Sequence, residues 1–327
     1  MIKLTSTPRA ALAAIAMAVF TAPTIAPAQD YPSKPVRIIV PYAPGGPTEF
    51  VSRTVGDGLS RRLGQPFLIE SRPGANTRIG TEAAARAPAD GYTLLLVSTP
   101  FSTNLALFAS LPYDTSRDFR AVVHMVNVPT AIFVPQDSPI KDVREFVALA
   151  KAKPGAVTVG TAGNATSTHL LLENLAMLTG AQFTHVPFKG DAPSITELIA
   201  GRISAGIHPL GVPLPHVKAG RLRAISVNVE RRLALLPDVA TLTEQGLKEA
   251  SSSTWFGLAA HSGVSNGIVG RLNAEAVAVL AQPEVRDRLA DTGLLAVGGT
   301  PEQFDAHIRA EIQRWGTVIR TRGIKVE

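Results

Sequence analysis

Short apolar runs alternate with segments of helical periodicity along most of the chain, and this alternation restricts the fold more than any other feature of the sequence. Val36–Val40 is typical of a strand, and Val51, Val55, Leu59 and Leu63 then recur every four positions, as on one face of a helix. This order predicts the α/β class, in which parallel strands are flanked by helices. Further strands are expected at residues 67–70 and 93–97, with a helix at 80–86 between them.

The same rhythm restarts after Asp118, so we expect a second unit of similar size. About 300 residues are enough for two domains of ordinary size. Its strands are expected at 131–135, 157–161, 183–186 and 203–207, and its helices at 143–152, 169–178 and 194–200. The later segments, which have to pack against one of the two units, are strands at 222–229 and 256–260 and helices at 268–281 and 301–322.

The simplest arrangement returns the C-terminal part of the chain to the first unit. We therefore expect two lobes, each a mostly parallel sheet flanked by helices. Residues 29–127 and 226–327 would form the first lobe, and residues 128–225 the second. The runs 122–128 and 222–229 would be the two crossings between the lobes. Two adjacent crossings form a hinge, so a ligand cleft is expected between the lobes, opposite that hinge.

The first residues have the order of a secretory signal peptide. Lys3 and Arg9 precede an apolar stretch at 10–22, and Ala26–Pro27–Ala28 supplies a cleavage pattern of small residues. A membrane anchor is the alternative, but the apolar stretch is too short and too rich in alanine to span a bilayer. We expect residues 1–28 to be removed before Gln29 and the protein to be exported. The chain has no cysteine, so neither a disulfide nor a lipid-anchored N-terminus is expected.

Charge and motif content argue against several classes of function. The chain has 32 Lys and Arg and 26 Asp and Glu, and two of the basic residues lie in the signal peptide. The densest basic pairs, Arg61–Arg62 and Arg231–Arg232, form no stripe with interleaved aromatics, so no nucleic-acid partner is expected. The sequence also lacks a G-x-S-x-G turn, an H-E-x-x-H helix, a phosphate loop and a dinucleotide fingerprint. No catalytic residue, metal or cofactor is therefore expected.

Pro41–Pro47 lies between the first strand and the helix that follows it. Ligands of open α/β sheets collect at this edge, and Gly45 and Gly46 would let backbone N–H groups approach a ligand closely. The free N–H groups and the dipole of the helix favour an anion there, and without a lysine in the loop a carboxylate is favoured over a phosphate. The alternative is a plain tight turn. The candidate ligand-binding residues of this loop are Tyr42, Ala43, Gly45, Gly46, Pro47 and Thr48.

Other strand-to-helix loops repeat this arrangement. Gly160–His169 follows a strand in the second unit, and its Thr166 is a typical N-cap residue, so simple capping is the alternative there. Arg78 could pair with a carboxylate or could be an ordinary exposed side chain, and His208 could face the cleft. The candidates from these segments are Ala75, Asn76, Arg78, Ser98, Thr99, Gly163, Asn164, Ala165, Thr166, Phe188, Gly190, Asp191 and His208.

Seven short motifs, spread over nearly all of the chain after the signal peptide, resemble the Bug family of periplasmic solute-binding proteins, the receptors of tripartite tricarboxylate transporters. The resemblance implies a two-lobed periplasmic-binding-protein fold of type II character and a monomer that closes on a small organic carboxylate. It also implies that amides and hydroxyls at Gly45, Gly46, Thr166 and Gly190 hold the ligand, and that two integral membrane components receive it. The motifs are Pro41–Glu49, Arg72–Ala75, Leu111–Phe119, Gly163–His169, Val186–Gly190, Leu236–Thr241 and Arg314–Gly316.

Several positions depart from the pattern that the family usually shows. Glu49 replaces Asp, Ala165 replaces Gly, and Thr166 replaces Ser. Phe188 replaces Tyr, and Thr77–Arg78 and His208–Pro209 replace pairs that are commonly Gly-Asn and Asp-Asn. These last changes add aromatic and basic groups, so we hypothesise a ligand with a second anionic group or an aromatic body, such as an aromatic dicarboxylate. Two other functions stay open from the sequence: a ligand-sensing subunit for a signalling partner, and an exported hydrolase or transferase.

Overall fold

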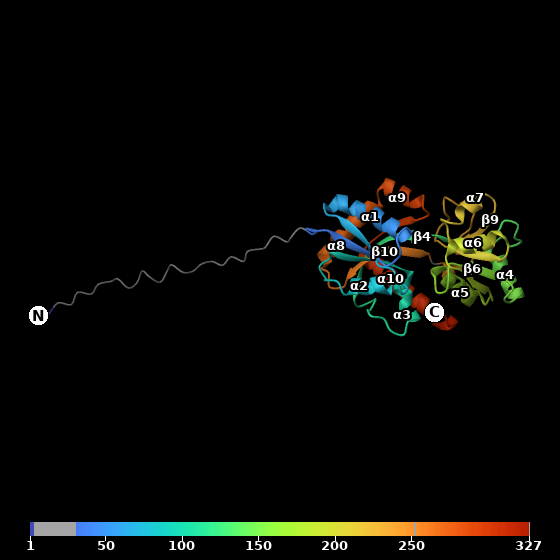
Figure 1. Cartoon of the computed structure of the whole chain (residues 1–327), viewed down its shortest axis with the longest axis horizontal. Helices are drawn as coiled ribbons and strands as arrows, with labels where there is room; N and C mark the ends of the chain where they lie inside the picture. The colour runs from blue at the N-terminus through green and yellow to red at the C-terminus, as the bar shows by residue number, and fades with distance from the viewer. Residues whose placement is uncertain (3–30, 252, 327) are drawn as a thin grey trace.

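The computed structural model describes residues 1–2, 31–251 and 253–326, so the expected signal peptide and its cleavage point lie largely outside the described residues. Two bodies lie side by side, each built around one β-sheet with helices on both faces (Figure 1). The predicted α/β class and two-lobed organisation are therefore confirmed. Within the described part of the chain, no helix has the length and apolar character needed to cross a membrane.

The first sheet has the order β11-β4-β10-β3-β1-β2. Only β1 pairs in parallel, with β2 and β3, while β10 lies between β3 and β4 and runs antiparallel to both. The sheet is thus mixed and not mostly parallel, because a strand from the C-terminal part of the chain is inserted in its middle. Its strands are β1 (Val36–Val40), β2 (Phe67–Ser71), β3 (Thr93–Ser98), β4 (Phe119–Val128), β10 (Thr254–His261) and β11 (Leu295–Gly298).

Helices cover both faces of this sheet because each presents an apolar stripe to it. On one face, Val51, Val55 and Leu59 of α1 (Pro47–Leu63) are fully buried with α8 (Asn266–Leu280) and α9 (Pro283–Ala290). On the other face lie α2 (Arg78–Ala85), α3 (Thr99–Leu107) and α10 (Pro301–Arg322), which bury Ala84, Phe101 and Phe304.

The second sheet has the order β7-β6-β8-β5-β9. It is also mixed, since β6 pairs in parallel with β7 and β8, and β5 runs antiparallel to β8 and β9. Phe146 of α4 and Leu171 of α5 are buried on one face, and Leu198 of α6 is buried on the other. The elements are β5 (Thr130–Pro135), α4 (Val143–Ala152), β6 (Thr158–Thr161), α5 (Ser167–Thr179), β7 (Thr184–Pro187), α6 (Asp191–Ile199), β8 (Ala205–Pro209), α7 (Leu214–Lys218), β9 (Leu222–Val227) and η1 (Lys248–Ala250).

The two connections between the sheets differ from the expected crossings in one respect. The first runs from Val128, the last residue of β4, through Pro129 into β5, close to the predicted position. The second was expected at 222–229, but β9 belongs to the second sheet, where Val227 pairs with Ala131. The return to the first sheet therefore lies between β9 and β10. The exact lobe limits stay a prediction, and the sheets place all of β9 with the second lobe.

The C-terminal helix α10 also joins the two bodies. Its last turns reach the second body near α5 (Figure 1), where Leu170 of α5 packs with Trp315 and Ile319. Arg322 Nε donates a hydrogen bond to Glu173 Oε2 at 2.5 Å on the same surface. The helix that caps the first sheet is therefore also a contact with the second lobe.

Candidate functional site

The strand ends that bear the candidate loops meet at the junction of the two sheets. β4 ends at Val128 and β5 begins at Thr130, so this edge of the first sheet adjoins the matching edge of the second. Phe256 of β10 pairs with Ser98, which places the C-terminal ends of β1 and β3 on the same edge as Thr254. The Thr254 hydroxyl donates to Ser167 Oγ at 2.7 Å, a direct bond between the two edges. We call these the facing edges.

The predicted site residues divide between these edges. The loops at 41–48, 75–78 and 98–99 follow β1, β2 and β3 of the first sheet. The loops at 163–166 and 188–191, together with His208, follow or end β6, β7 and β8 of the second. The topology therefore brings all of the candidate segments to one junction, as parallel strands with helical connections require.

Most helices that begin at the facing edges lack a side-chain cap, whereas three of the four helices α4, α8, α9 and α10, which begin elsewhere, have one. α4, α8 and α10 start away from these edges, and their N-cap side chains, Asp142, Ser265 and Thr300, accept hydrogen bonds from amides of the first turn. At the facing edges, α1, α2, α3 and α6 have no side-chain cap within the described residues. Each helix leaves its first amides without intrahelical acceptors, so these four starts keep donors for another partner. Only α5 is capped there, by Thr166.

Ser98 is the N-cap residue of α3, but its side chain does not accept a hydrogen bond from the first turn of the helix. Serine is a preferred N-cap residue, but the Ser98 hydroxyl forms a very short hydrogen bond with the hydroxyl of Tyr42 instead. Burial raises the pKa of Tyr42 to about 12, against the opposing effect of this bond, so the phenol stays protonated at neutral pH. The pair ties the β1 loop to the end of β3.

Glu49 occupies one of the amides that were expected to face a ligand. Its Oε2 accepts a hydrogen bond from Gly45 N at 2.7 Å, and its Oε1 accepts one from Arg53 Nε at 2.7 Å. The Gly45 amide and Arg53 hold the pKa of Glu49 below its usual range. Gly46 is the N-cap of α1 with extended backbone, and Pro47 opens the helix as predicted. A carboxylate of the chain itself thus binds this loop.

The loop between β2 and α2 adopts a backbone that side chains normally avoid. Ala75, Asn76 and Thr77 have φ of 47°, 51° and 72° in succession. Asn76 Nδ2 donates to Asn104 Oδ1 at 2.7 Å, and Asn104 Nδ2 returns a bond to the Asn76 carbonyl at 2.9 Å, which holds this strained conformation. The Arg78 guanidinium lies 4.0 Å from the centroid of the Phe108 ring, and its Nε donates to the Ala75 carbonyl. The Arg78 side chain therefore contacts and stabilises the loop from which it comes.

Three hydroxyls near these helix starts are buried without a partner in the described part of the chain. They belong to Thr77, Thr99 and Ser102, whose exposed fractions are 6%, 4% and 1%. Buried hydroxyls are nearly always hydrogen-bonded in folded proteins. The polar run that contains Thr99, Ser102 and Asn104 follows a buried strand, and only Thr99 of the three was singled out from the sequence.

The β6–α5 loop of the second lobe is held by its own polar groups. Thr166 Oγ1 donates to the Gly163 carbonyl at 2.8 Å and caps His169 N. Ala165 has φ of 55°, a left-handed conformation that glycine adopts most readily, and its amide donates to His169 Nδ1 at 3.0 Å. Nδ1 of His169 is therefore an acceptor, and the ring proton lies on Nε2, 3.5 Å from Glu173 Oε1. Capping by Thr166, the simpler alternative, is confirmed.

His169 also belongs to a stack of two imidazoles. Its ring lies 3.8 Å from that of His185 with an interplanar angle of 7°, and His185 Nε2 is 2.7 Å from Thr161 Oγ1. Burial and the neighbouring His169 lower the pKa of His185 to about 4. Burial acts to raise the pKa of Glu173, but bonds from His169 and Arg322 outweigh it and lower that pKa to about 2.

Asp191, His208 and Ser194 form a hydrogen-bonded chain that resembles a hydrolase triad. His208 Nδ1 is 2.8 Å from Asp191 Oδ1, and its Nε2 is 3.1 Å from Ser194 Oγ. Both His208 and Ser194 are fully buried, and Gly160 packs so closely on Ser194 that a Cβ would lie 2.3 Å from the hydroxyl. His208 thus fastens α6 to β8 and presents no surface to a ligand here. Gly190 N is likewise engaged, by the Ala162 carbonyl at 3.0 Å.

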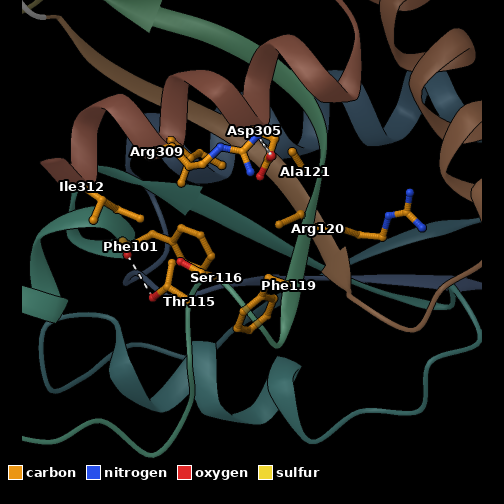
Figure 2. Close-up of a pocket in the computed structure, with 11 residues that line it drawn as sticks. Phe101, Thr115, Ser116, Phe119, Arg120, Ala121, Asp305, Arg309 and Ile312 are labelled. Atoms are coloured by element: carbon orange, nitrogen blue, oxygen red, sulfur yellow. Dashed lines mark hydrogen bonds and ion pairs between the residues drawn. The ribbon is translucent and has the colours of Figure 1, made fainter.

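A small cavity of about 40 Å³ lies at the N-terminal end of β4, away from the end that leads to the second sheet (Figure 2). Phe101, Phe119 and Ile312 line it, and Asp305 and Arg309 of α10 point toward one another beside it. Thr115 donates to the Phe101 carbonyl at 3.3 Å. This volume suits about one water molecule and no larger ligand.

Comparison with known proteins connects this geometry to a family. The family described as the tripartite tricarboxylate transporter family receptor matches residues 51–324. Protein BugT of Bordetella pertussis is 35% identical over 97% of this chain and 98% of its own length. An R. palustris protein solved with adipate superposes with a TM-score of 0.76 at 31% identity, over 90% of this chain and 99% of its own. MatC from Rhodopseudomonas palustris, solved with bound malate, gives a TM-score of 0.72 at 30% identity, over 88% and 100%.

The match extends over most of the described fold, and the relatives align along nearly their whole lengths. The resemblance seen in the motifs is therefore confirmed. This chain belongs to the tripartite tricarboxylate transporter receptor family, whose members are periplasmic solute-binding proteins of the Bug type.

Proposed function

We propose that this protein is a non-enzymatic periplasmic receptor that closes its lobes on a small organic carboxylate and delivers it to a tripartite tricarboxylate-type membrane transporter. The observation that carries the proposal is the set of helix starts without side-chain caps at the facing edges. A carboxylate is the small group best suited to several amide donors at the positive ends of helices. The relatives solved with adipate and malate support a ligand of this class.

The first amides of α1 are the strongest candidates for the primary contact. A Cβ at Gly46 would meet only the Thr48 hydroxyl, at 3.9 Å, and Thr48 and Glu49 are the next residues with amides that helix geometry leaves unbonded. Asn164 and Thr166 of the second lobe would close over the same group. Hydrogen bonds to a charged group contribute about 1.5–3 kcal/mol each before the costs of binding, so a few of them are enough for micromolar affinity.

The nature of the remainder of the ligand is a separate proposal. Arg78 and Phe108 stack beside the β2–α2 loop, and Phe188 offers a half-buried ring beside Gly160 in the second lobe. These groups favour a ligand with an aromatic body or a second anionic group. Glu49 places a competing negative charge in the first loop, so a second carboxylate would have to lie toward Arg78 and away from Glu49.

Titration calorimetry on the mature protein tests both the carboxylate-receptor proposal and the proposal about the remainder of the ligand. The panel contains adipate, malate, citrate, benzoate and the three phthalate isomers. At least one carboxylate should bind with a dissociation constant near or below about 10 µM. Tight binding of citrate with no binding of any aromatic acid would remove the aromatic proposal and keep the receptor. Failure of every acid in the panel would count against the receptor proposal itself.

Sensing for a signalling partner is the second function, because it would use the same closed lobes. Deletion of the genes for a tripartite tricarboxylate-type membrane transporter in the host separates the two, since uptake of the bound acid should cease if the protein serves transport. The hydrolase alternative loses support because Ser194 is fully buried behind His208. Incubation with a panel of simple esters should show no hydrolysis above that of a Ser194→Ala variant.

A further inference from the structure

A cavity of about 650 Å³ lies on the other side of the connections between the lobes. Its walls come from Asn127 of β4, from β11 and α10, and from residues 229–234 of the returning chain. In the first sheet, β11 and β4 lie at the opposite end from β1 and β2, and in the second sheet β9 lies opposite β7. The two connections therefore separate this back pocket from the candidate carboxylate loops. Its volume is in the range of small-molecule sites.

Guanidinium groups line one part of the back pocket. Arg232 Nε is bonded to Glu244 at 3.0 Å, and Arg314 Nη1 donates to the Ser251 carbonyl at 3.0 Å, so both are held in place. Arg231 is exposed and forms no ion pair with any described residue. The Arg231 guanidinium can therefore pair with an anionic ligand in this pocket.

Acidic side chains neutralise two of the three guanidinium groups and leave that of Arg231. Glu244 pairs with Arg232, and Glu311 lies 3.5 Å from Arg314 Nη1. Glu311 is buried and also accepts hydrogen bonds from the indoles of Trp255 and Trp315 at 3.2 and 2.7 Å. Glu230 is the other acid that lines the pocket, and it is exposed. Burial lowers the pKa of His124 to about 3, and burial also lowers the pKa of His307 below its usual range, so both rings are neutral at pH 7.

Apolar side chains line another part of the pocket. Leu295 and Val297 of the edge strand β11 are 36% and 46% exposed, and Leu233 of the returning chain also lines the pocket but is largely buried. Large aliphatic side chains left on a concave surface next to a free guanidinium match a ligand with one anionic group and an apolar body.

We propose that the back pocket is a second binding site, for a small organic anion that carries one carboxylate on an apolar body. Such a ligand would contact both connections between the lobes, through Asn127 and through residues 229–234. Because the pocket and the carboxylate loops lie on opposite sides of these connections, closure of one side changes the walls of the other. Occupancy of the back pocket would therefore alter affinity at the facing edges, and the coupling would be reciprocal.

Fluorine NMR with 4-fluorobenzoate as the probe tests the site in the mature protein. Arg231→Gln should weaken binding about tenfold, as expected for loss of a charge-assisted contact. Val297→Glu, which places a negative charge on the apolar wall, should weaken it at least as much. Arg61→Gln is the matched control, because Arg61 is also an exposed arginine but lies in the last turn of α1.

A variant at the facing edges separates the two sites. Gly46→Asp adds an anion to the α1 loop and should leave binding of the probe at the back pocket unchanged. The proposal is overturned if Gly46→Asp abolishes probe binding while Arg231→Gln and Val297→Glu preserve it, since the probe would then occupy the facing edges. It is also overturned if wild type shows no saturable binding up to about 10 mM probe.

Discussion

Glu49 is the residue whose side chain most alters the expected chemistry of the site. Its carboxylate reaches back to the amide of Gly45 at 2.7 Å, and the aspartate expected at this position from the family resemblance is one methylene shorter. The chain thereby satisfies one donor of its own binding loop. A ligand that uses this amide has to displace Glu49, and the displaced charge would still face Arg53.

Glu49→Ala tests this competition. Removal of the carboxylate frees the Gly45 amide, so we expect the best carboxylate of the panel to bind several-fold more tightly in calorimetry, up to about tenfold. Glu82→Ala is the matched control, because Glu82 forms the same i,i+4 ion pair with Arg86 on α2. Weaker binding by Glu49→Ala would show that Glu49 contacts the ligand directly.

The helix starts at the facing edges form a pattern on the scale of whole elements. Four helices have no side-chain cap at the junction of the lobes, whereas α4, α8 and α10, which start elsewhere, have one and only α9 among these outer helices lacks it. A cap stabilises a helix but consumes the donors that a ligand needs. Local stability has therefore been given up at the places where an anion is proposed to bind.

Gly46→Asp introduces a side-chain N-cap at the start of α1. Gly46 already has the extended backbone of an N-cap, and its added side chain meets no atom closer than 3.9 Å. We expect stability to rise by a few tenths of a kcal/mol, and carboxylate affinity to fall about tenfold or more because the new carboxylate takes the free amides. Gln282→Asp, at the uncapped start of α9, should give a similar gain in melting temperature without loss of affinity. Unchanged ligand affinity in Gly46→Asp would exclude these amides from the site.

The elements were predictable where apolar periodicity is strong. α4 and α10 lie at the expected residues, and most strands end within two residues of expectation. α3 was not expected, because Thr99, Ser102 and Asn104 on its buried side hide the apolar stripe. The helices α7 and α9 and the strand β11 are short and bury few side chains, so their patterns are weak.

The candidate site was predictable as a set of loops but not as a set of contacts. Strand ends followed by glycine and hydroxyl residues are visible in the sequence, and topology then brings them together. The partner of each group depends on side-chain geometry that no local pattern contains. Arg78 stacks on Phe108, His208 is buried against Ser194, and the Gly190 amide donates to the Ala162 carbonyl of the neighbouring β6–α5 loop.

At the scale of the whole molecule, α10 bridges two lobes that the chain otherwise joins only through its two connections. Its polar contact is the bond from Arg322 to Glu173, whose pKa is lowered to about 2. A carboxylate with a lowered pKa stabilises the folded state above its unfolded pKa, and this contribution is lost as the pH falls from about 4.5 toward 2.

Arg322→Gln should therefore lower stability by about 1 kcal/mol at pH 7, a modest amount because the arginine is partly exposed. Scanning calorimetry at pH 7, 4 and 3 should show the difference in melting temperature shrinking as Glu173 gains a proton. Arg309→Gln is the control, since Arg309 pairs with Asp305 within α10 alone. A difference that stays constant across this pH range would assign the effect to packing of Arg322.

The insertion of β10 between β3 and β4 has a consequence for a chain that emerges from its N-terminal end. Every strand of the second sheet lies before residue 228, so that lobe has its full set of strands while the first lobe is still divided in two. Until Thr254–His261 is synthesised, β3 pairs only with β1 and has a free edge on its other side, and β4 has no neighbour in its sheet. The first sheet of the nascent chain is therefore completed only when β10 has been synthesised. A product truncated before β10 would leave the edges of β3 and β4 unpaired and able to pair with strands of other chains.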